Sequence, residues 1–473
     1  MITMRKTKII CTIGPACEDE KTLTEMVRAG MNVARLNFSH GTHEDHLKKI
    51  ELIKRVRKKL NAPVAIMLDT KGPEYRIKTF KEGKVNLHQG DHFTFTTRDV
   101  DGNQNEVSVN YTHLAEDLEV GDTIFLNNGL LKFTVESLTD TDVTCVVDVG
   151  GELSNRKSMS FPGKVLKQPY FSEQDQSDIL FGIENDVDFI ACSFVSCKDD
   201  LVQVKRFLEE HGGENIDIIA KIENRSGVEN FREICSVCEG IMVARGDMGV
   251  EIPFEELPAI QKHLITECRL LGKRVITATE MLESMIYNTR PTRAEISDVA
   301  NAVYDGTSAI MLSGETAAGQ YPVLTVETMS KIAEETEKHI DYKKRFLTSQ
   351  FTIQNTVDAI SHATCGMAID IDASCIAVCS MSGATVRMVS RFRSPVDILG
   401  LTVNEKTWRK LSLSWGVLPV LCEEIYESID VLFYTAKHLA RKHFHLAKGD
   451  RIVVTGGVSG ISGTTNIIKI ETV

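Results

Sequence analysis

Charged side chains directly follow several apolar segments in the first two thirds of this 473-residue chain. The cations are Arg35, Lys221 and Arg245, and the carboxylates are Asp69, Glu223, Asp247 and Glu315. Mg²⁺ prefers oxygen ligands and typically uses one or two carboxylates together with substrate oxygens. Phosphoryl transfer requires a metal ion, positive charge and positioning, and little covalent help from the protein. A lysine beside two carboxylates on neighbouring segments therefore predicts chemistry on a phosphorylated substrate.

The segment Gly246-Asp247-Met248-Gly249 predicts a second kind of anion site. Its two glycines flank an expected helix start, where main-chain N–H groups can hold a carboxylate or a phosphate. Structural interpretations stay open for single residues. Arg35 and Asp69 can form an ordinary ion pair, and Asn37 and Ser39 can cap a helix. Polar groups at six strand ends together favour a functional site over this structural alternative.

An alternation of strands and helices must place these side chains on one face. Three strands are expected first, at Lys8–Ile13, Asn32–Asn37 and Pro63–Asp69. Five more are expected later, at Val187–Ser193, Ile216–Ile222, Gly240–Arg245, Arg274–Thr279 and Ser308–Leu312. Eight parallel strand–helix units predict an α/β fold, a (β/α)8 TIM barrel with its active site at the carboxyl ends of the strands.

Two further units complete the predicted organisation. Between the third and fourth barrel strands, helical periodicity gives way to short alternating strands and turns, which predict a small all-β barrel inserted into the α/β barrel. After about Asp341, strands and helices alternate again in an α/β C-terminal domain. The predicted boundaries are 1–70 with 169–341 for the (β/α)8 barrel, 71–168 for the inserted β-barrel and 342–473 for the C-terminal domain.

Composition narrows the classes of partner and compartment. The net charge of −12 and the absence of a long basic stripe argue against nucleic-acid binding. The longest apolar runs are far shorter than the roughly 20 residues of a spanning helix, and the first 15 residues do not resemble a signal peptide. We therefore expect a cytoplasmic protein without membrane contact. Cys235 and Cys238 form a CxxC pair without a matching second pair nearby, so a metal or redox role is not favoured.

Six strings closely resemble the pyruvate kinase family, in the order and spacing of that family. They are MNVARLNFSHG at 31–41, LDTKGPE at 68–74, AKIEN at 220–224, MVARGDMGVEIP at 242–253, RPTRAE at 290–295 and IMLSGET at 310–316. The resemblance covers the whole chain and is to the bacterial type without an extra C-terminal phosphohistidine-like domain. It implies a glycolytic phosphotransferase that converts phosphoenolpyruvate and ADP to pyruvate and ATP.

The resemblance also implies roles for individual residues. The catalytic set would be Lys221, Thr279 and Arg35. Phosphoenolpyruvate would be bound by Gly246, Asp247, Thr279, Lys221 and Arg35, and the nucleotide by His40 and Arg76. Mg²⁺ or Mn²⁺ would be held by Glu223 and Asp247, and K⁺ by Asn37, Ser39, Asp69 and Thr70. Glu74 is the residue type of potassium-dependent members. The inserted β-barrel at 71–168 would act as a lid domain that closes to exclude water, and the domain at 342–473 would be regulatory.

Regulation and assembly are further expectations from the resemblance. A loop with Ser380, Ser382, Gly383 and Thr385, together with the glycine-rich segment 456–463, would hold a phosphosugar effector. Two ordinary tight turns are the alternative. The stretch 290–295 lies near a subunit contact in the family, so the resemblance implies an allosteric homotetramer.

Five positions depart from the usual family pattern. They are Tyr75, Asn127, Asn128, Phe161 and Glu280, of which four fall in the lid or its hinges. Two alternatives to an active kinase stay open at this point. One is a catalytically weak metabolite-binding barrel, supported only by the lid departures. The other is a related Mg²⁺-dependent pyruvate lyase or aldolase, which would not need the lid or the C-terminal domain.

Overall fold

The computed structural model describes residues 4–164, 166–423, 428–457 and 465–473. A closed barrel of eight parallel strands, paired in the order β1-β16-β15-β14-β13-β12-β3-β2, confirms the predicted TIM-type fold. Its strands are β1 (Lys8–Thr12), β2 (Val33–Asn37), β3 (Ala65–Asp69), β12 (Phe189–Cys192), β13 (Asp217–Ile222), β14 (Gly240–Ala244), β15 (Arg274–Ala278) and β16 (Ala309–Leu312).

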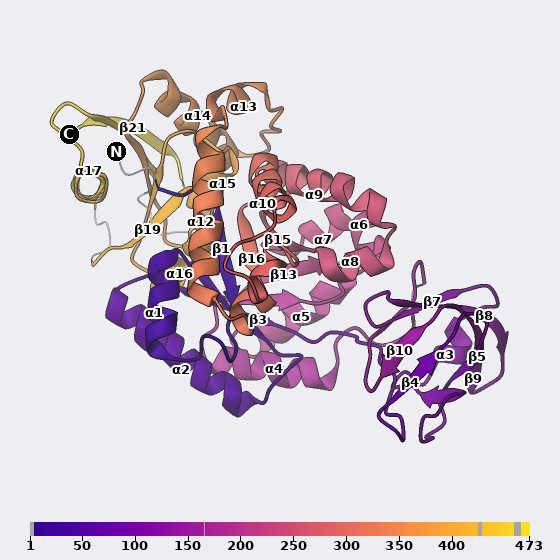
Figure 1. Cartoon of the computed structure of the whole chain (residues 1–473). Coiled ribbons are helices and arrows are strands. Elements are labelled where there is room, and N and C mark those ends of the chain that lie inside the picture. The colour runs from indigo at the N-terminus through magenta and orange to yellow at the C-terminus, as the bar shows by residue number, and fades with distance from the viewer. Residues whose placement is uncertain (1–3, 165, 424–427, 458–464) are drawn as a thin grey trace.

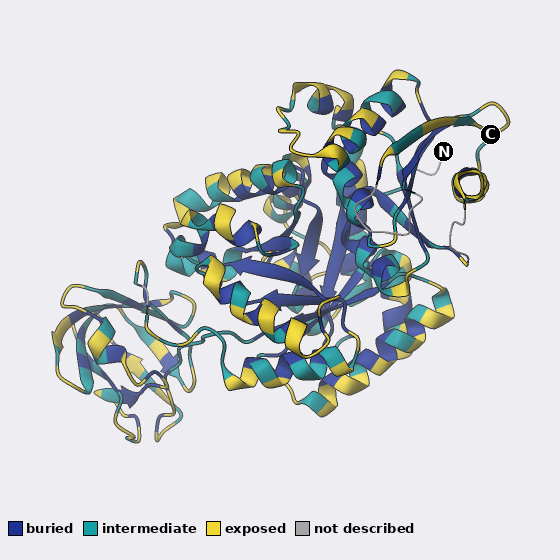
Figure 2. Ribbon diagram, turned by 180° about the vertical axis from the view of Figure 1, so that it is seen from behind, coloured by how far each residue is buried: buried dark blue, intermediate teal, exposed yellow. Residues whose placement is uncertain are grey.

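Successive side chains of the barrel strands point alternately inward and outward, which gives one apolar core inside the barrel and another between the strands and the helices. Ile10 points inward with Phe189 and Met242, whereas its neighbour Ile9 belongs to the larger core between strands and helices. The surrounding helices show buried inner faces and exposed outer faces (Figure 2). They are α1 (Glu20–Ala29), α2 (His43–Leu60), α4 (Glu173–Glu184), α5 (Lys198–Glu210), α6 (Arg225–Glu229), α7 (Phe231–Cys235), α8 (Arg245–Glu251), α9 (Leu257–Leu271), α10 (Arg293–Asp305), α11 (Gly314–Ala317) and α12 (Pro322–Lys338), with short 3₁₀ turns at Phe254–Glu256 and Glu283–Ile286. The next helix, α13 (Tyr342–Thr348), lies beside α14 (Thr356–Asp370) (Figure 1), and its Phe346 joins the core of the C-terminal unit.

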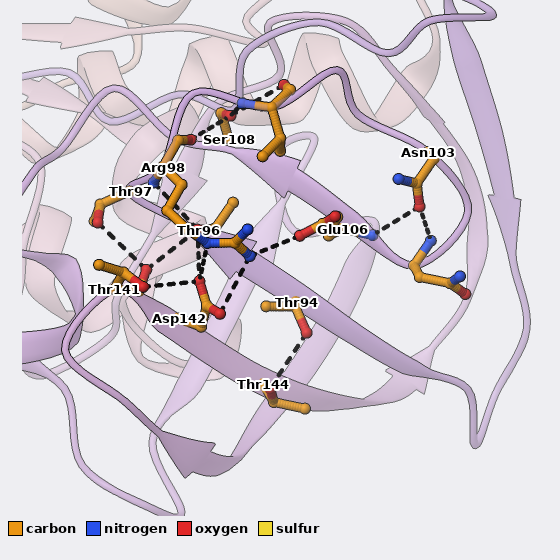
Figure 3. Close-up of polar contacts among 12 residues, drawn as sticks. Thr94, Thr96, Thr97, Arg98, Asn103, Glu106, Ser108, Thr141, Asp142 and Thr144 are labelled. Carbon is orange, nitrogen blue, oxygen red and sulfur yellow. Dashed lines mark hydrogen bonds and ion pairs between the residues drawn. The ribbon is translucent and has the colours of Figure 1, made fainter.

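The inserted segment is all-β apart from the short helix α3 (Leu114–Asp117). Its strands form a six-stranded sheet in the order β11-β7-β8-β9-β5-β6 and a two-stranded sheet β10-β4. Arg98 pairs with both Asp142 and Glu106 across the larger sheet (Figure 3), and Phe93, Phe95 and Phe133 fill its core. The strands are β4 (Lys84–Leu87), β5 (His92–Thr96), β6 (Glu106–Ser108), β7 (Thr123–Leu126), β8 (Leu131–Leu138), β9 (Asp142–Val149), β10 (Gly151–Ser154) and β11 (Met159–Ser160).

The C-terminal unit is a five-stranded sheet in the order β19-β18-β17-β20-β21, parallel except for β21. Its elements are α14 (Thr356–Asp370), β17 (Cys375–Cys379), α15 (Ala384–Arg391), β18 (Ile398–Thr402), α16 (Glu405–Lys410), a 3₁₀ turn (Leu411–Leu413), β19 (Val417–Leu421), α17 (Ile429–Phe444), β20 (Arg451–Gly456) and β21 (Ile467–Thr472). None of the described helices combines the length and apolar character that a bilayer crossing requires.

The lid and the C-terminal unit lie on opposite sides of the barrel (Figure 1). The C-terminal unit meets the amino ends of the barrel strands through buried charges. Arg409 donates to Asp188, just before β12, and Lys410 pairs with Asp217 at the start of β13, each at 2.7 Å. The C-terminal unit therefore leaves the carboxyl ends of the strands uncovered, and the lid faces them across a cavity.

Arg409→Met is expected to destabilise the folded chain by about 3–5 kcal/mol, because it leaves a buried carboxylate without its main cation. The Asp188 side chain is fully buried, and burial already raises its pKa although Arg409 opposes the shift. Urea unfolding measures the loss. The matched control is Lys406→Met, since Lys406 pairs with the half-exposed Asp186 and should contribute less than about 1 kcal/mol. Equal losses in both variants would contradict the prediction.

Candidate active site

The Lys221 ammonium is the centre of the polar groups at the carboxyl mouth of the barrel. Its Nζ lies 3.1 Å from Asp69 Oδ1, 3.1 Å from Glu223 Oε1 and 2.6 Å from Ser193 Oγ. Asp69 ends β3, Ser193 follows β12, and Lys221 and Glu223 lie at the end of β13. The four side chains are nearly fully buried. Three adjacent strands therefore hold one cation between two carboxylates, out of water.

Mutual attraction keeps this cluster charged against the effect of burial. Burial alone would lower the pKa of Lys221, but Asp69 and Glu223 raise it above its ordinary value. Burial would likewise raise the pKa of Asp69, but Arg35 and Lys221 lower it. Glu223 differs, because burial outweighs its contact with Lys221 and raises its pKa to about 7. A further cation beside this carboxyl would favour its charged form and lower its pKa.

Arg35 and the residues expected at a monovalent-cation site surround Asp69. Arg35 donates through Nε to Asp69 Oδ2 at 2.6 Å and through Nη1 to Thr12 Oγ1 at 2.9 Å. Asn37 lies opposite Asp69 in the register of β2 and β3, and its Oδ1 accepts the Ser39 N–H. The structure thus brings Asn37, Ser39, Asp69 and Thr70 to one corner of the mouth.

The turn after β15 holds Thr279 in an unusual conformation. Thr279 and Glu280 have φ angles of 69° and 52°, in the left-handed region that β-branched residues rarely adopt. The Gly246 N–H donates to Thr279 Oγ1 at 2.8 Å, so two of the residues expected to bind a carboxylate are already in contact. Strained backbone of this kind is concentrated at functional sites.

Two charged residues from the strand ends have structural partners instead. Arg245 donates to the Thr279 carbonyl oxygen at 2.6 Å and pairs with Asp298 at 2.7 Å. Glu315 accepts the main-chain N–H groups of Leu282 and Ser313. Arg245 is therefore turned toward the β15 turn and does not supply free positive charge to the mouth, contrary to the sequence interpretation.

A cavity of about 510 Å³ lies between the barrel mouth and the lid. Residues from both parts line it, including Arg35, Asn37, Ser39, His40, Glu74, Arg76, Asn128, Phe161, Lys221 and Asp247. Glu74 pairs with Arg76, and Arg76 also donates to the Arg156 carbonyl oxygen. The two residues expected at the nucleotide, His40 and Arg76, thus face the same space as Lys221.

Four of the departures from the family pattern gather around this space. Tyr75 and Phe161, from the two chain segments that join lid and barrel, pack edge to face with ring centroids 5.5 Å apart. Asn127 and Asn128 form the β7–β8 turn with φ angles of 52° and 56°, which asparagine tolerates well. The Asn128 side chain lines the cavity. The contact between Tyr75 and Phe161 therefore holds together the two chain segments that join the lid to the barrel.

The expected effector residues lie far from this mouth, in the C-terminal unit. Ser380 follows β17, and Gly383, with a φ of 75°, caps the start of α15, the helix that contains Thr385. The partner segment 456–463 lies mainly outside the described residues, which end at 457 and resume at 465. Thr385 hydrogen-bonds Thr465 just after that gap.

The cysteine pair is a separate, buried feature. Cys235 lies against both Cys238 and Cys268, and hydrogen bonding among these thiols together with burial raises the pKa of Cys235 and of Cys238. Among the described residues, no three Cys, His, Asp or Glu side chains are grouped as ligands for a metal ion.

Sequence reasoning missed Ser193 and Phe194. Ser193 accepts a hydrogen bond from Lys221, and the Phe194 N–H donates to Glu223 Oε2 at 2.6 Å. The signal was present, because Ser193 is a polar residue directly after the apolar fourth strand of the barrel.

Family models, curated proteins and a solved structure match this chain over nearly its whole length. Residues 4–326 match the family described as pyruvate kinase, barrel domain, and residues 358–471 match pyruvate kinase, alpha/beta domain. Pyruvate kinases of Clostridium acetobutylicum and Clostridium perfringens are 46% and 44% identical, each over 99% of this chain and 100% of the relative. A crystal structure of a pyruvate kinase from Cryptosporidium parvum superposes with a TM-score of 0.94 at 37% identity, covering 99% of this chain and 96% of the other.

Proposed function

The chain belongs to the pyruvate kinase family, and from this premise we propose how its own residues perform the reaction. The activity is that of a phosphotransferase that converts phosphoenolpyruvate and ADP to pyruvate and ATP. The observation that carries the residue assignment is the Lys221 ammonium, buried between Asp69 and Glu223 under the lid. A fixed, desolvated positive charge stabilises the charge that spreads over a phosphoryl group in transfer.

Glu223 and Asp247 would hold Mg²⁺ or Mn²⁺ together with the substrate. Two observations support this assignment. Glu223 Oε1 is buried and accepts no hydrogen bond, although Lys221 lies 3.1 Å away. Asp247 lies near enough to contribute to the raised pKa of Glu223. The divalent ion, when bound, would neutralise charge on the phosphoryl and enolate oxygens.

The substrate carboxylate would be bound by the Gly246 and Asp247 amides and by Thr279, whose strained turn is held by Arg245. Thr279 would also direct a proton to the enolate, either from its own hydroxyl or through a water. Arg35 would contact the phosphate on the side of Asp69, and His40 and Arg76 would contact the nucleotide. Asn37, Ser39, Asp69 and Thr70 would supply amide, hydroxyl and carboxylate oxygens to K⁺.

One assay tests the function together with its cofactors. Pyruvate formation from phosphoenolpyruvate is measured with and without ADP, Mg²⁺ and K⁺. Strict dependence on ADP and Mg²⁺ is expected, with a large stimulation by K⁺. Turnover without ADP would point to a lyase-like or hydrolytic reaction and would remove the proposal.

The C-terminal loop with Ser380, Ser382, Gly383 and Thr385 would bind a phosphosugar effector, because helix starts suit phosphate. Titration of the activity with sugar mono- and bisphosphates tests this, and a flat response would exclude it. A homotetramer, expected from the family, is tested by sedimentation of the purified chain.

Docking of the lid is expected to weaken as the pH rises from about 4.5 to 7. Glu251, on the barrel, faces the lid residues Ser160 and Phe161, and burial there raises its pKa to about 7. When the lid lifts, water returns this pKa toward its ordinary value of 4.5. The docked form therefore binds the proton more tightly, so docking is favoured at low pH and loses this advantage by pH 7.

Hydrogen exchange of the amides around Ser160 and Phe161, at pH 5.5 and pH 7.5, measures this effect after correction for intrinsic exchange rates. Faster opening is expected at the higher pH. Glu251→Gln provides the control, since an uncharged amide of the same shape should remove the difference. Equal opening at both pH values in the parent chain would contradict the prediction.

A further inference from the structure

Ser193 occupies a buried position between Lys221 and the strand end that carries Asp69 and Thr70. It directly follows β12, is 2% exposed and lies against the loop after β3. A Cβ on Gly72 of that loop would come within 2.9 Å of the Ser193 Cβ. The two strand ends are thus packed closely enough that the position of the Ser193 hydroxyl is fixed by the backbone around it.

The hydrogen-bond directions of Ser193 follow from its partners. Lysine is only a donor, so Ser193 Oγ accepts from Lys221 Nζ at 2.6 Å. The single hydroxyl proton is then donated to the Thr70 carbonyl oxygen, 2.7 Å away, in preference to Asp69 Oδ1 at 3.3 Å. The Ser193 N–H also donates to Thr70 Oγ1. Ser193 therefore joins the Lys221 ammonium to the segment expected to bind the monovalent cation.

The Lys221 ammonium donates hydrogen bonds to Asp69 and Ser193 and lies 3.1 Å from Glu223 Oε1 without a hydrogen bond to it. Of these three neighbours, Ser193 is the uncharged one and gives the shortest contact. A third carboxylate at this position would orient the ammonium but would also neutralise its charge. A hydroxyl orients it and leaves the positive charge available for an incoming anion. A divalent ion held by Glu223 would compete with Lys221 for that carboxylate. It would not compete for the uncharged Ser193 hydroxyl, so the contact between Ser193 and Lys221 would persist.

We propose that Ser193 is a positioning residue, whose hydroxyl aims the Lys221 ammonium at the phosphoryl group and couples it to the Asp69–Thr70 strand end. The proposal rests on the proposed role of Lys221. It predicts that loss of the hydroxyl affects turnover more than substrate binding, because the misplaced charge is needed most in the transition state.

Ser193→Ala and Ser193→Cys test the proposal in the full chain. Cysteine fills nearly the same space with a much weaker acceptor, so it separates the loss of the hydrogen bond from the loss of packing. In both variants kcat is expected to fall about 10- to 100-fold, with KM for phosphoenolpyruvate and the Mn²⁺ affinity changed less than about threefold. Retention of kcat within about threefold in both variants would overturn the proposal.

Ser390→Ala is the matched control for loss of a buried serine hydroxyl. Ser390 donates to the Trp415 carbonyl oxygen at 2.6 Å in the C-terminal unit, far from the mouth. This variant should lower the unfolding midpoint about as much as Ser193→Ala while kcat stays at the parent value. A similar kcat loss in the control would show that destabilisation, and not the position of Lys221, explains the Ser193 result.

A double-mutant cycle separates this inference from the proposed function. If Ser193 acts through Lys221, adding Ser193→Ala to Lys221→Met should lower the residual rate less than about twofold. A full additional 10- to 100-fold loss would show that Ser193 acts independently and would overturn the inference. Normal turnover of Lys221→Met alone would instead refute the role proposed for Lys221.

Discussion

Lys221→Met is expected to lower kcat by at least about 1000-fold, with a much smaller change in affinity for the divalent ion. Methionine has nearly the length and volume of lysine but no charge, so the barrel should fold around it. What is lost is the ammonium that lies between Asp69 and Glu223 at the barrel mouth. Single-turnover measurement of the phosphoryl-transfer step is the direct test.

The neighbours of Lys221 determine the conditions for that experiment. Asp69 keeps Arg35 as a partner, so its charge should persist. Glu223 loses the cation that opposes the effect of burial, so its pKa should rise further above 7. Proton competition at this carboxyl would then weaken metal binding at neutral pH. Mn²⁺ affinity should therefore be compared with the parent chain above pH 8.

Lys8→Met is the matched control, because Lys8 is also a buried barrel lysine but lies at the opposite end of the strands. Its Nζ donates to the Val417 carbonyl oxygen at 2.7 Å, and burial lowers its pKa to about 7. Removal of this ammonium should leave kcat unchanged. Near-normal turnover of Lys221→Met, or an equal loss in both variants, would contradict the assignment of Lys221.

Most of the architecture could be predicted from the sequence because apolar strands fully buried in a parallel barrel have a strong pattern. The ends of helices α1 and α2 also follow from residue type, since Asp19 and Thr42 cap their starts and Gly30 and Asn61 end them in left-handed conformations. The lid was harder to predict. Its two-residue strand β11 and its divided sheets depend on pairings between distant segments, which local patterns do not encode.

The candidate site was predictable as a set of strand ends but not as a set of contacts. From residue type, Arg245 and Glu315 were predicted to belong with the catalytic charges. In the structure Arg245 donates to the Thr279 carbonyl oxygen and Glu315 accepts the Leu282 N–H, so both stabilise backbone turns. Conversely, residue type did not predict a role for the uncharged Ser193, although its hydroxyl makes the shortest contact of Lys221. Which of several polar side chains face one another depends on barrel tilt and rotamers, which the sequence alone does not specify.

Glu223→Gln should weaken divalent-ion binding by at least about 100-fold and reduce turnover in proportion at limiting metal. The amide keeps the shape of the carboxylate, and its oxygen can still accept the Phe194 N–H. Its NH₂ group would face Lys221, where Glu223 Oε1 now lies. A neutral group replaces the carboxylate, so the mouth loses one of two proposed ligands and gains a donor that repels metal ions. Calorimetric Mn²⁺ titration measures the effect.

Glu315→Gln distinguishes loss of a ligand from disturbance of a buried carboxylate. Glu315 is fully buried at the same end of the barrel, and its two oxygens accept the N–H groups of Leu282 and Ser313. An amide there must turn its NH₂ group toward an N–H donor, which should cost about 1–3 kcal/mol of stability. Mn²⁺ affinity should nevertheless stay at the parent value. Tight Mn²⁺ binding by Glu223→Gln, or equal weakening in both variants, would contradict the assignment of Glu223, whose buried Oε1 accepts no hydrogen bond and is therefore proposed as a ligand.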